Sequence, residues 1–306
     1  MNPLIESCIN LAQAGNKGEM SYLAPYQSQS LQNLGKYLLN SNGQSENGML
    51  GVRQTHSSRR LVICFGAGID SYLALWNALD KQSKTPMYES ITLLHLDYGQ
   101  PFCLRERLVM QKIQDAFKSK IQTPIRKDVE TFCGDSWVSF YVKTIRSIVK
   151  PDTDLSWENY IIPARNLVIA AAASEFGDDI EIIATKRSDE TVGTPDKTSR
   201  FFTQASYVLT EFYGRRIQVT SPFLNLSKLE TVKRYLAMGG TREALKETTS
   251  CYSETSSDLS HCGKCYACYK RYKLFQELDI AYSFIHHPAK APNFTEYEER
   301  ERAKRG

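Results

Sequence analysis

The stretch with the clearest chemical signature is Gly66-Ala67-Gly68-Ile69-Asp70-Ser71, which follows the apolar run of residues 61–65. Small residues after such a run predict a sharp turn from a buried parallel strand into a helix. The unpaired amide groups at a helix start favour an anion, most often a phosphate. Ser71 would add a hydroxyl donor, and Asp70 is suited to hold a magnesium ion that bridges phosphates. The pattern is neither a Walker A motif nor a Rossmann fingerprint, and alone it also fits a tight turn without a ligand.

A second group of chemically active residues is the cysteine cluster near the end of the chain. Its spacing is Cys-x10-Cys-x2-Cys-x2-Cys, formed by Cys251, Cys262, Cys265 and Cys268. Four thiolates on a short loop are typical of a closed tetrahedral zinc site, which leaves no position for water and is therefore structural. An iron–sulfur cluster is the alternative, because three close cysteines and one distant cysteine also suit iron.

Polar residues follow two further elements at positions where parallel strands and their helices present ligand-binding groups. Asp97 and Tyr98 come directly after the apolar run of residues 91–96, and Arg165 and Asn166 fall in the first turn of an Ala-rich helix that opens at Pro163. Ligands of doubly wound sheets lie beyond the carboxyl ends of the strands, so these side chains are expected beside the turn at Gly66. The alternatives are a helix cap for Asp97 and a surface salt bridge for Arg165.

A long polar connection follows the strand expected over residues 179–184. It contains Lys186, Asp189 and Asp196, and such connections at the carboxyl end of a strand commonly carry substrate-specific contacts. These residues are therefore candidates for contacting a substrate.

The elements that must position these groups alternate between strand and helix patterns. Strands are expected at residues 61–65, 91–96, 124–127, 179–184 and 217–219, with residues 128–160 as an irregular insertion. Helices are expected at residues 71–82, 104–117, 163–176, 201–213 and 227–239, the last opened by the capping box Ser227-Lys228-Leu229-Glu230 and ended by Gly239-Gly240. This alternation predicts an α/β fold with a doubly wound parallel sheet.

Composition limits the function classes. The 306 residues, 42% hydrophobic, can bury a sizeable core, and a net charge of +4 without a block of like charges argues against direct nucleic-acid binding. No apolar run is long enough for a bilayer, and the start lacks the order of a signal peptide, so a cytoplasmic protein is expected. Disulfides are rare in that compartment, which favours metal binding by the cysteine cluster.

Together the motifs resemble the 7-cyano-7-deazaguanine synthase family of the ATP pyrophosphatase (PP-loop) superfamily. The resemblance rests on the turn at Gly66–Ser71 and, in the family's order, on Asp97-Tyr98-Gly99-Gln100, Pro163-Ala164-Arg165-Asn166, Pro195-Asp196, Ser227-Lys228-Leu229-Glu230 and the cysteine segment. It implies an enzyme that uses ATP and Mg²⁺ to adenylate 7-carboxy-7-deazaguanine. Ammonia would then displace AMP to give the amide, which would be dehydrated to the nitrile.

The resemblance also implies roles for individual residues. Gly66, Ala67, Gly68, Ile69 and Ser71 would cradle the pyrophosphate, Asp70 would bind Mg²⁺, and Asp97 and Tyr98 would lie near the nucleoside. Arg165 would offset negative charge and Asn166 would orient the substrate, with Asp70, Ser71 and Arg165 as the catalytic group. Lys186, Asp189 and Asp196 would recognise the deazapurine or its carboxylate, and Zn²⁺ would be held by the four cysteines.

Three features depart from the family pattern. Gly66 and Ala67 stand where the family has Ser and Gly, Lys197 stands where it has Cys, and about 60 residues precede the first strand. These departures leave open a ligase that passes the activated carboxylate to an amine of a protein partner or stops at the amide, or an inactive nucleotide-binding module. We expect an N-terminal extension over residues 1–60, an ATP-binding domain over 61–245 and a zinc-binding segment over 246–306. A homodimer is one assembly that the sequence leaves open.

Overall fold

The computed structural model describes residues 59–85, 87–121, 138–145, 164–184, 195–253 and 259–303. The chain divides into two compact units. The described residues within 58–203 and 219–306 belong to one unit, and residues 204–218 belong to the other. The predicted strand at residues 124–127 and most of the extension over residues 1–60 lie outside the described residues.

The elements alternate between strand and helix from the first described strand onward. They are β1 (Arg60–Cys64), α3 (Ile69–Lys84), β2 (Ser90–Asp97), α4 (Cys103–Ile121), β3 (Val138–Thr144), α6 (Arg165–Ala173), β4 (Asp179–Glu181), η3 (Pro195–Lys197), α7 (Ser199–Tyr213), β5 (Gln218–Thr220), α8 (Lys228–Ala237), α9 (Arg242–Lys246), α10 (Tyr266–Glu277), η4 (Pro288–Lys290) and α11 (Phe294–Ala303).

The strands described form one sheet in the order β3-β2-β1-β4-β5. β1 pairs in parallel with both β2 and β4, and β2 pairs in parallel with β3. The strand order reverses at β1, which makes the boundary between β1 and β4 the topological switch point where α/β sheets bind ligands. The predicted doubly wound parallel sheet is confirmed.

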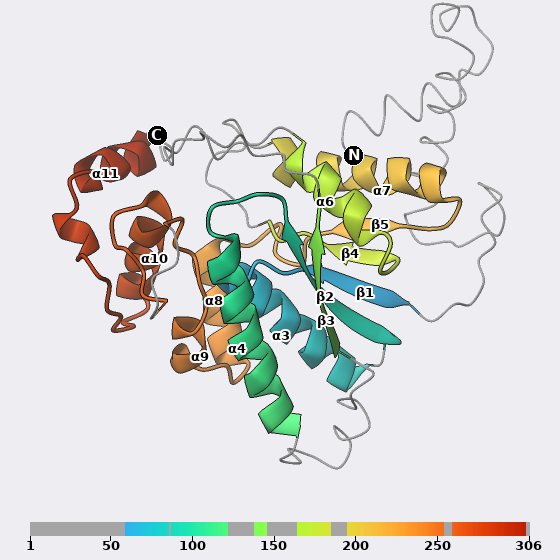
Figure 1. Ribbon diagram of the computed structural model, residues 1–306, viewed down its shortest axis with the longest axis horizontal. Helices are drawn as coiled ribbons and strands as arrows, with labels where there is room; N and C mark the ends of the chain where they lie inside the picture. Colours follow the sequence, from blue (N-terminus) through green and yellow to red (C-terminus); the bar gives the residue numbers. More distant parts are fainter. Residues whose placement is uncertain are drawn as a thin grey trace, which may run out of the picture. The chain divides into compact units, whose positions relative to one another are not determined.

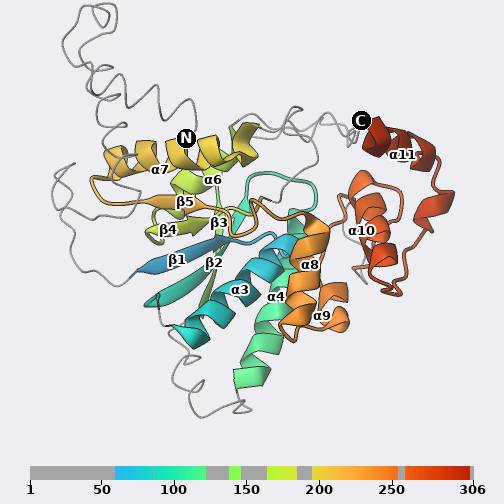
Figure 2. The same cartoon turned by 180° about the vertical axis from the view of Figure 1, so that it is seen from behind.

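Helices cover both faces of the sheet, as Figure 1 and the reverse view in Figure 2 show for α3 and α4 on one face and α6 on the other. The main core lies under α3 and α4, where Leu61, Ile63 and Phe65 pack with apolar residues of α3, α4, α8 and α10. A strand buried on both faces needs the continuous apolar run that β1 and β2 carry.

One prediction within the described residues was wrong. Residues 138–144 were expected to be irregular, but they form β3 beside β2, with Val138 opposite Ile91 and Val142 opposite His95. Val138, Phe140 and Val142 alternate with Ser139 and other residues, the two-residue period of a strand. By contrast, the capping box at Ser227 is confirmed: its hydroxyl accepts from the Glu230 amide and the Glu230 carboxylate accepts from the Ser227 amide.

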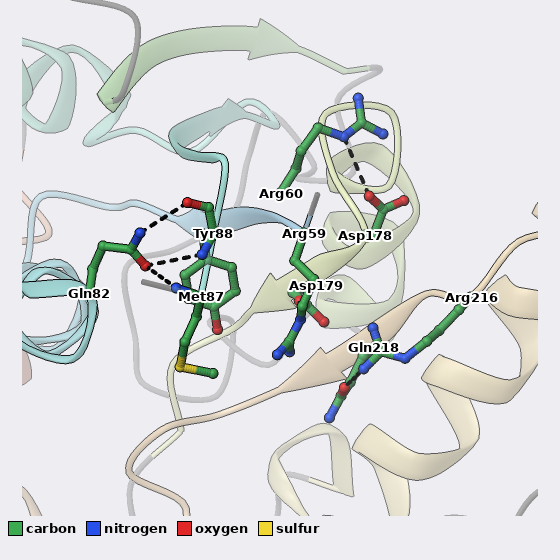
Figure 3. Close-up of polar contacts among 9 residues, drawn as sticks. All are labelled: Arg59, Arg60, Gln82, Met87, Tyr88, Asp178, Asp179, Arg216 and Gln218. Carbon is green, nitrogen blue, oxygen red and sulfur yellow. Dashed lines mark hydrogen bonds and ion pairs between the residues drawn. The ribbon is translucent and has the colours of Figure 1, made fainter. Parts of the chain in front are cut away.

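The amino ends of β1 and β4 are tied together by charged side chains (Figure 3). Arg59 Nε lies 2.6 Å from Asp179 Oδ2, and Arg60 Nε lies 3.4 Å from Asp178 Oδ2. Gln82 Oε1 accepts hydrogen bonds from the amides of Met87 and Tyr88, which fixes the connection from α3 to β2. The polar groups of this edge thus pair with one another, at the edge opposite the turn at Gly66.

The second unit is described by residues 204–218. The Thr210 hydroxyl accepts from the Ile217 amide at 3.0 Å and donates to the Ile217 carbonyl at 3.1 Å, which closes the turn after α7. Arg216 also hydrogen-bonds to Gln218.

Among the helices of the described residues, none combines the length and apolar character that crossing a membrane requires.

Candidate functional site

The turn between β1 and α3 leaves the start of α3 without a side-chain cap. Gly68 is the N-cap of α3 and offers no side chain to cap it, so the helix start relies on other partners for its amide groups. Ala67 has a φ of +52°, a left-handed conformation that glycine adopts more easily. The Ala67 carbonyl accepts a hydrogen bond from the Thr249 amide at 2.9 Å. The turn is therefore fixed by a backbone hydrogen bond from the segment that leads to Cys251, the first cysteine of the cluster.

Asp70 lies in the first turn of α3 and has one engaged and one unengaged oxygen. Its Oδ2 accepts from Lys228 Nζ, the first residue of α8, at 3.1 Å. Its Oδ1 is buried and has no hydrogen-bond partner among the described residues. A buried carboxylate oxygen without a donor is costly unless a cation or water satisfies it. Asp70 therefore fits the chemistry of a magnesium ligand.

Ser71 is buried, and its hydroxyl donates to the Gly68 carbonyl at 3.1 Å. This bond closes the turn on itself and leaves the hydroxyl oxygen as an acceptor. Lys228, in contrast, was read from the sequence only as part of a capping box. Its ammonium group is brought to Asp70 by the packing of α8 against α3.

The Asp97-Tyr98-Gly99-Gln100 turn follows β2 and is fixed by its own side chains. Asp97 Oδ1 accepts from the Gly99 amide at 3.1 Å, and Gln100 Oε1 accepts from the Tyr98 amide at 2.9 Å. Asp97 therefore supports the turn rather than capping a helix. Burial raises the pKa of Tyr98, and the positive charge of Arg165 works against this rise. The structure thus brings Tyr98 and Arg165, which the sequence placed at the same edge, into interaction.

Asn166 and Asp196 are also brought together. Asn166 is buried and its side-chain amide donates to the Asp196 carbonyl at 3.0 Å. This bond fixes the short helix η3 against the start of α6. Lys186 and Asp189 lie outside the described residues.

One acidic residue at this edge carried no signal in the sequence. Glu106 in α4 lies beside Gly66, and its Oε2 accepts from Gln100 Nε2 at 3.0 Å. Burial raises the pKa of Glu106 to about 8, against the opposing effects of Gln100 and Arg165. Helical periodicity alone places such a residue on a solvated helix face. The contacts of Glu106 with Gly66 and Gln100 show instead that it faces the turn.

The four predicted cysteines converge. The sulfur atoms of Cys251, Cys262, Cys265 and Cys268 all lie within 4.8 Å of one another, and those of Cys262 and Cys268 are 3.8 Å apart. A tetrahedron with zinc–sulfur bonds of about 2.3 Å has sulfur–sulfur edges of about 3.8 Å. The amides of Cys262 and Lys264 donate to the sulfurs of Cys251 and Cys262, which favours thiolates. The cluster fits a metal such as zinc.

Two features hold the cysteine segment in shape. Gly263 has a φ of +77°, and a Cβ there would lie 1.6 Å from the His286 carbonyl oxygen, so no other residue fits this turn. His261 accepts from the Ser250 amide at 3.1 Å through Nε2, and its Nδ1 lies 2.6 Å from the Tyr282 hydroxyl. Burial lowers the pKa of His261 to about 2, so the ring is neutral. His261 therefore positions the residue next to Cys251.

The sheet order, the turn at the switch point and the cysteine cluster define an α/β protein with a candidate anion site at the strand ends and a separate group of four cysteines that fits a metal ion. The family model described as "Queuosine biosynthesis protein QueC" matches residues 60–279, and the chain belongs to this family. The resemblance seen in the motifs is thereby confirmed.

Curated relatives agree with this family. The chain is 27% identical over 235 residues to the 7-cyano-7-deazaguanine synthase of Methanococcus aeolicus, with 72% of this chain and 96% of the relative covered. It is 24% identical to the synthase of Pyrococcus abyssi (70% and 92% covered) and 25% identical to that of Methanocaldococcus jannaschii (71% and 94% covered). These names support a role in queuosine-type biosynthesis at the level of the family.

Proposed function

We propose that this protein is an ATP-dependent enzyme that converts 7-carboxy-7-deazaguanine to 7-cyano-7-deazaguanine. The substrate carboxylate is adenylated, ammonia displaces AMP to give the amide, and the amide is activated and dehydrated to the nitrile. The observation that carries the proposal is the buried, unengaged Oδ1 of Asp70 at the start of α3, at the switch point of the sheet. Family membership and the names of the relatives support the choice of substrate.

The chemistry requires a good leaving group. A carboxylate is a poor electrophile until its oxygen is transferred to AMP, and stabilisation of the departing pyrophosphate is then the main task of the protein. In the proposed site, the backbone amides of Gly66, Ala67, Gly68 and Ile69 would cradle the phosphates, and Asp70 would hold the magnesium ion. Bound magnesium would supply neutralisation of phosphate charge.

Two cations complete the proposed site. Lys228 pairs with Asp70 at 3.1 Å and would offer its ammonium group to a phosphate oxygen once Asp70 holds a metal ion. Arg165 interacts with Tyr98 and would offset the charge of the substrate carboxylate or of the α-phosphate. Asn166 would act through its bond to the Asp196 carbonyl, by positioning η3 at the substrate.

The test is the identity of the products. The purified protein is mixed with ATP, Mg²⁺ and 7-carboxy-7-deazaguanine, with and without ¹⁵N-ammonium, and the products are followed by mass spectrometry. The proposal expects AMP, pyrophosphate and a ¹⁵N-labelled nitrile that forms only with ammonium. A reaction that stops at the labelled amide, or that attaches the deazaguanine to an added protein amine, would replace the nitrile product with one of the alternatives. Unchanged ATP would contradict the enzymatic function altogether.

A further inference from the structure

The carboxyl group of Glu106 lies against the turn of residues 66–71, next to Gly66. A Cβ built on Gly66 would lie 3.1 Å from Glu106 Oε1, so a side chain at this position would require the carboxyl group to shift by a few tenths of an ångström. The family pattern has Ser at this position, so a hydroxyl there and the Glu106 carboxyl would compete for the same space. Glycine in place of serine at residue 66 thus leaves room for the Glu106 carboxyl beside the turn.

The Glu106 carboxyl is held in place by the turn after β2. Gln100 Nε2 donates both to Glu106 Oε2 and to the Leu96 carbonyl, each at 3.0 Å, while Gln100 Oε1 accepts from the Tyr98 amide. Oε2 is therefore engaged, and Oε1 is the oxygen directed at Gly66. The side chain of Glu106 is only 15% exposed. A carboxyl group fixed through one oxygen presents the other in a defined direction.

The surroundings of Glu106 disfavour its ionised form. The groups that face it are Asp97 and the neutral His95 of β2, Cys103 of α4, Tyr98 of the turn and Arg165 of α6. His95 is neutral because burial lowers its pKa, and its Nε2 lies 4.0 Å from Glu106 Oε2, so no ion pair forms there. With burial and Asp97 raising its pKa to about 8, Glu106 carries a proton at neutral pH.

We propose that Glu106 is a phosphate-binding residue that donates a hydrogen bond from its protonated Oε1 to an oxygen of ATP bound at the turn, in the place of the missing Ser hydroxyl. This inference rests on the proposed function, because it assumes that ATP occupies the turn. A neutral carboxylic acid is a strong donor to an anion, whereas a carboxylate at the same position would repel it. ATP binding should therefore weaken as Glu106 loses its proton.

The test is the dissociation constant of Mg²⁺-ATP, measured by isothermal titration calorimetry between pH 7 and pH 9. For a group with a pKa of about 8, the protonated fraction falls about tenfold over this range, so wild-type affinity should fall by up to about tenfold. Glu106→Gln keeps a neutral donor and should bind at pH 7 within about twofold of wild type without the pH-dependent loss. Glu106→Ala should bind about five- to tenfold more weakly at pH 7 and be equally insensitive to pH.

Two comparisons make the result decisive. Glu181→Gln removes another buried acid, on β4, whose pKa burial also raises, and this control should keep the wild-type pH profile. The ionisation of ATP itself is common to all variants and cancels in the comparison. Equal weakening by Glu106→Gln and Glu106→Ala at pH 7, with melting temperatures like that of wild type, would overturn the inference while leaving the ATP site intact. A wild-type protein that binds no ATP at any pH would overturn both this inference and the proposed function.

Discussion

The amide of Thr249 donates a hydrogen bond to the carbonyl oxygen of Ala67, with 2.9 Å between nitrogen and oxygen. Thr249 stands two positions before Cys251, and a Cβ at Gly68 would lie 3.2 Å from the Thr249 carbonyl oxygen. Arg271 of α10 is buried and donates to the Thr248 hydroxyl and to the Leu245 carbonyl. The turn at Gly66–Ser71 thus packs against a segment that leads into the cysteine cluster and is held in place by α10.

This relationship predicts that the fold around the turn depends on the metal content of the cysteine cluster. The protein should contain about one zinc ion per chain, and Cys265→Ala should lose it and unfold or aggregate, because metal binding supplies folding free energy. Metal analysis together with circular dichroism checks this expectation. Cys103→Ala is the matched control, since Cys103 lies outside the cluster and its replacement should leave the zinc content unchanged. A soluble, folded Cys265→Ala protein, or iron with visible absorbance in the wild type, would contradict it.

Backbone strain gives a second prediction. Ala67 and Ala164 both adopt left-handed conformations, with φ of +52° and +58°, but Ala67 is fully buried and Ala164 is exposed. Ala164→Gly should stabilise the protein by about 0.5–1 kcal/mol, because glycine relieves the strain and no burial is lost. In Ala67→Gly the lost methyl burial of about 0.8 kcal/mol should largely cancel the same gain. Urea denaturation measures the free energy of unfolding of both variants. A larger gain in stability for Ala67→Gly than for Ala164→Gly would refute this account of strain and burial.

The pH dependence of stability should reveal Glu181. This residue is 7% exposed, and its Oε2 has no hydrogen-bond partner among the described residues. Burial is the main reason that its pKa rises from 4.5 to about 7. The folded state therefore binds a proton that the unfolded state has released. The stabilisation from this proton is complete below pH 4.5 and is lost as pH rises to about 7.

The matching variant is Glu181→Gln, which removes the charge and keeps the shape. It should be more stable than wild type by about 1–3 kcal/mol at pH 8 and equal to it near pH 4. Chemical denaturation at the two pH values measures the difference, and Glu106 contributes to both proteins alike. The same difference at both pH values would show that packing, and not ionisation, accounts for the effect.

The sequence predicted the parts of the site that depend on local patterns. The strand, turn and helix around Gly66, the capping box at Ser227 and the cysteine spacing each lie within a short stretch whose residue types determine the local structure. β3 was missed because Tyr141 interrupts the alternation of Val138, Phe140 and Val142 with polar residues, and pairing with β2 decides the conformation of this strand. Lys228 and Glu106 were missed because their contacts with Asp70 and Gly66 join segments that are distant in the sequence.

The central claim is that Asp70 holds the metal ion of an ATP site, and release of AMP tests it most directly. Wild type and Asp70→Asn are incubated with ATP, Mg²⁺, 7-carboxy-7-deazaguanine and ammonium, and AMP and pyrophosphate are quantified by chromatography. Circular dichroism and zinc content, which should be the same in both proteins, show that the variant is folded. We predict that wild type releases AMP and pyrophosphate in equal amounts and that Asp70→Asn releases neither. AMP release by Asp70→Asn at the wild-type rate would contradict the account.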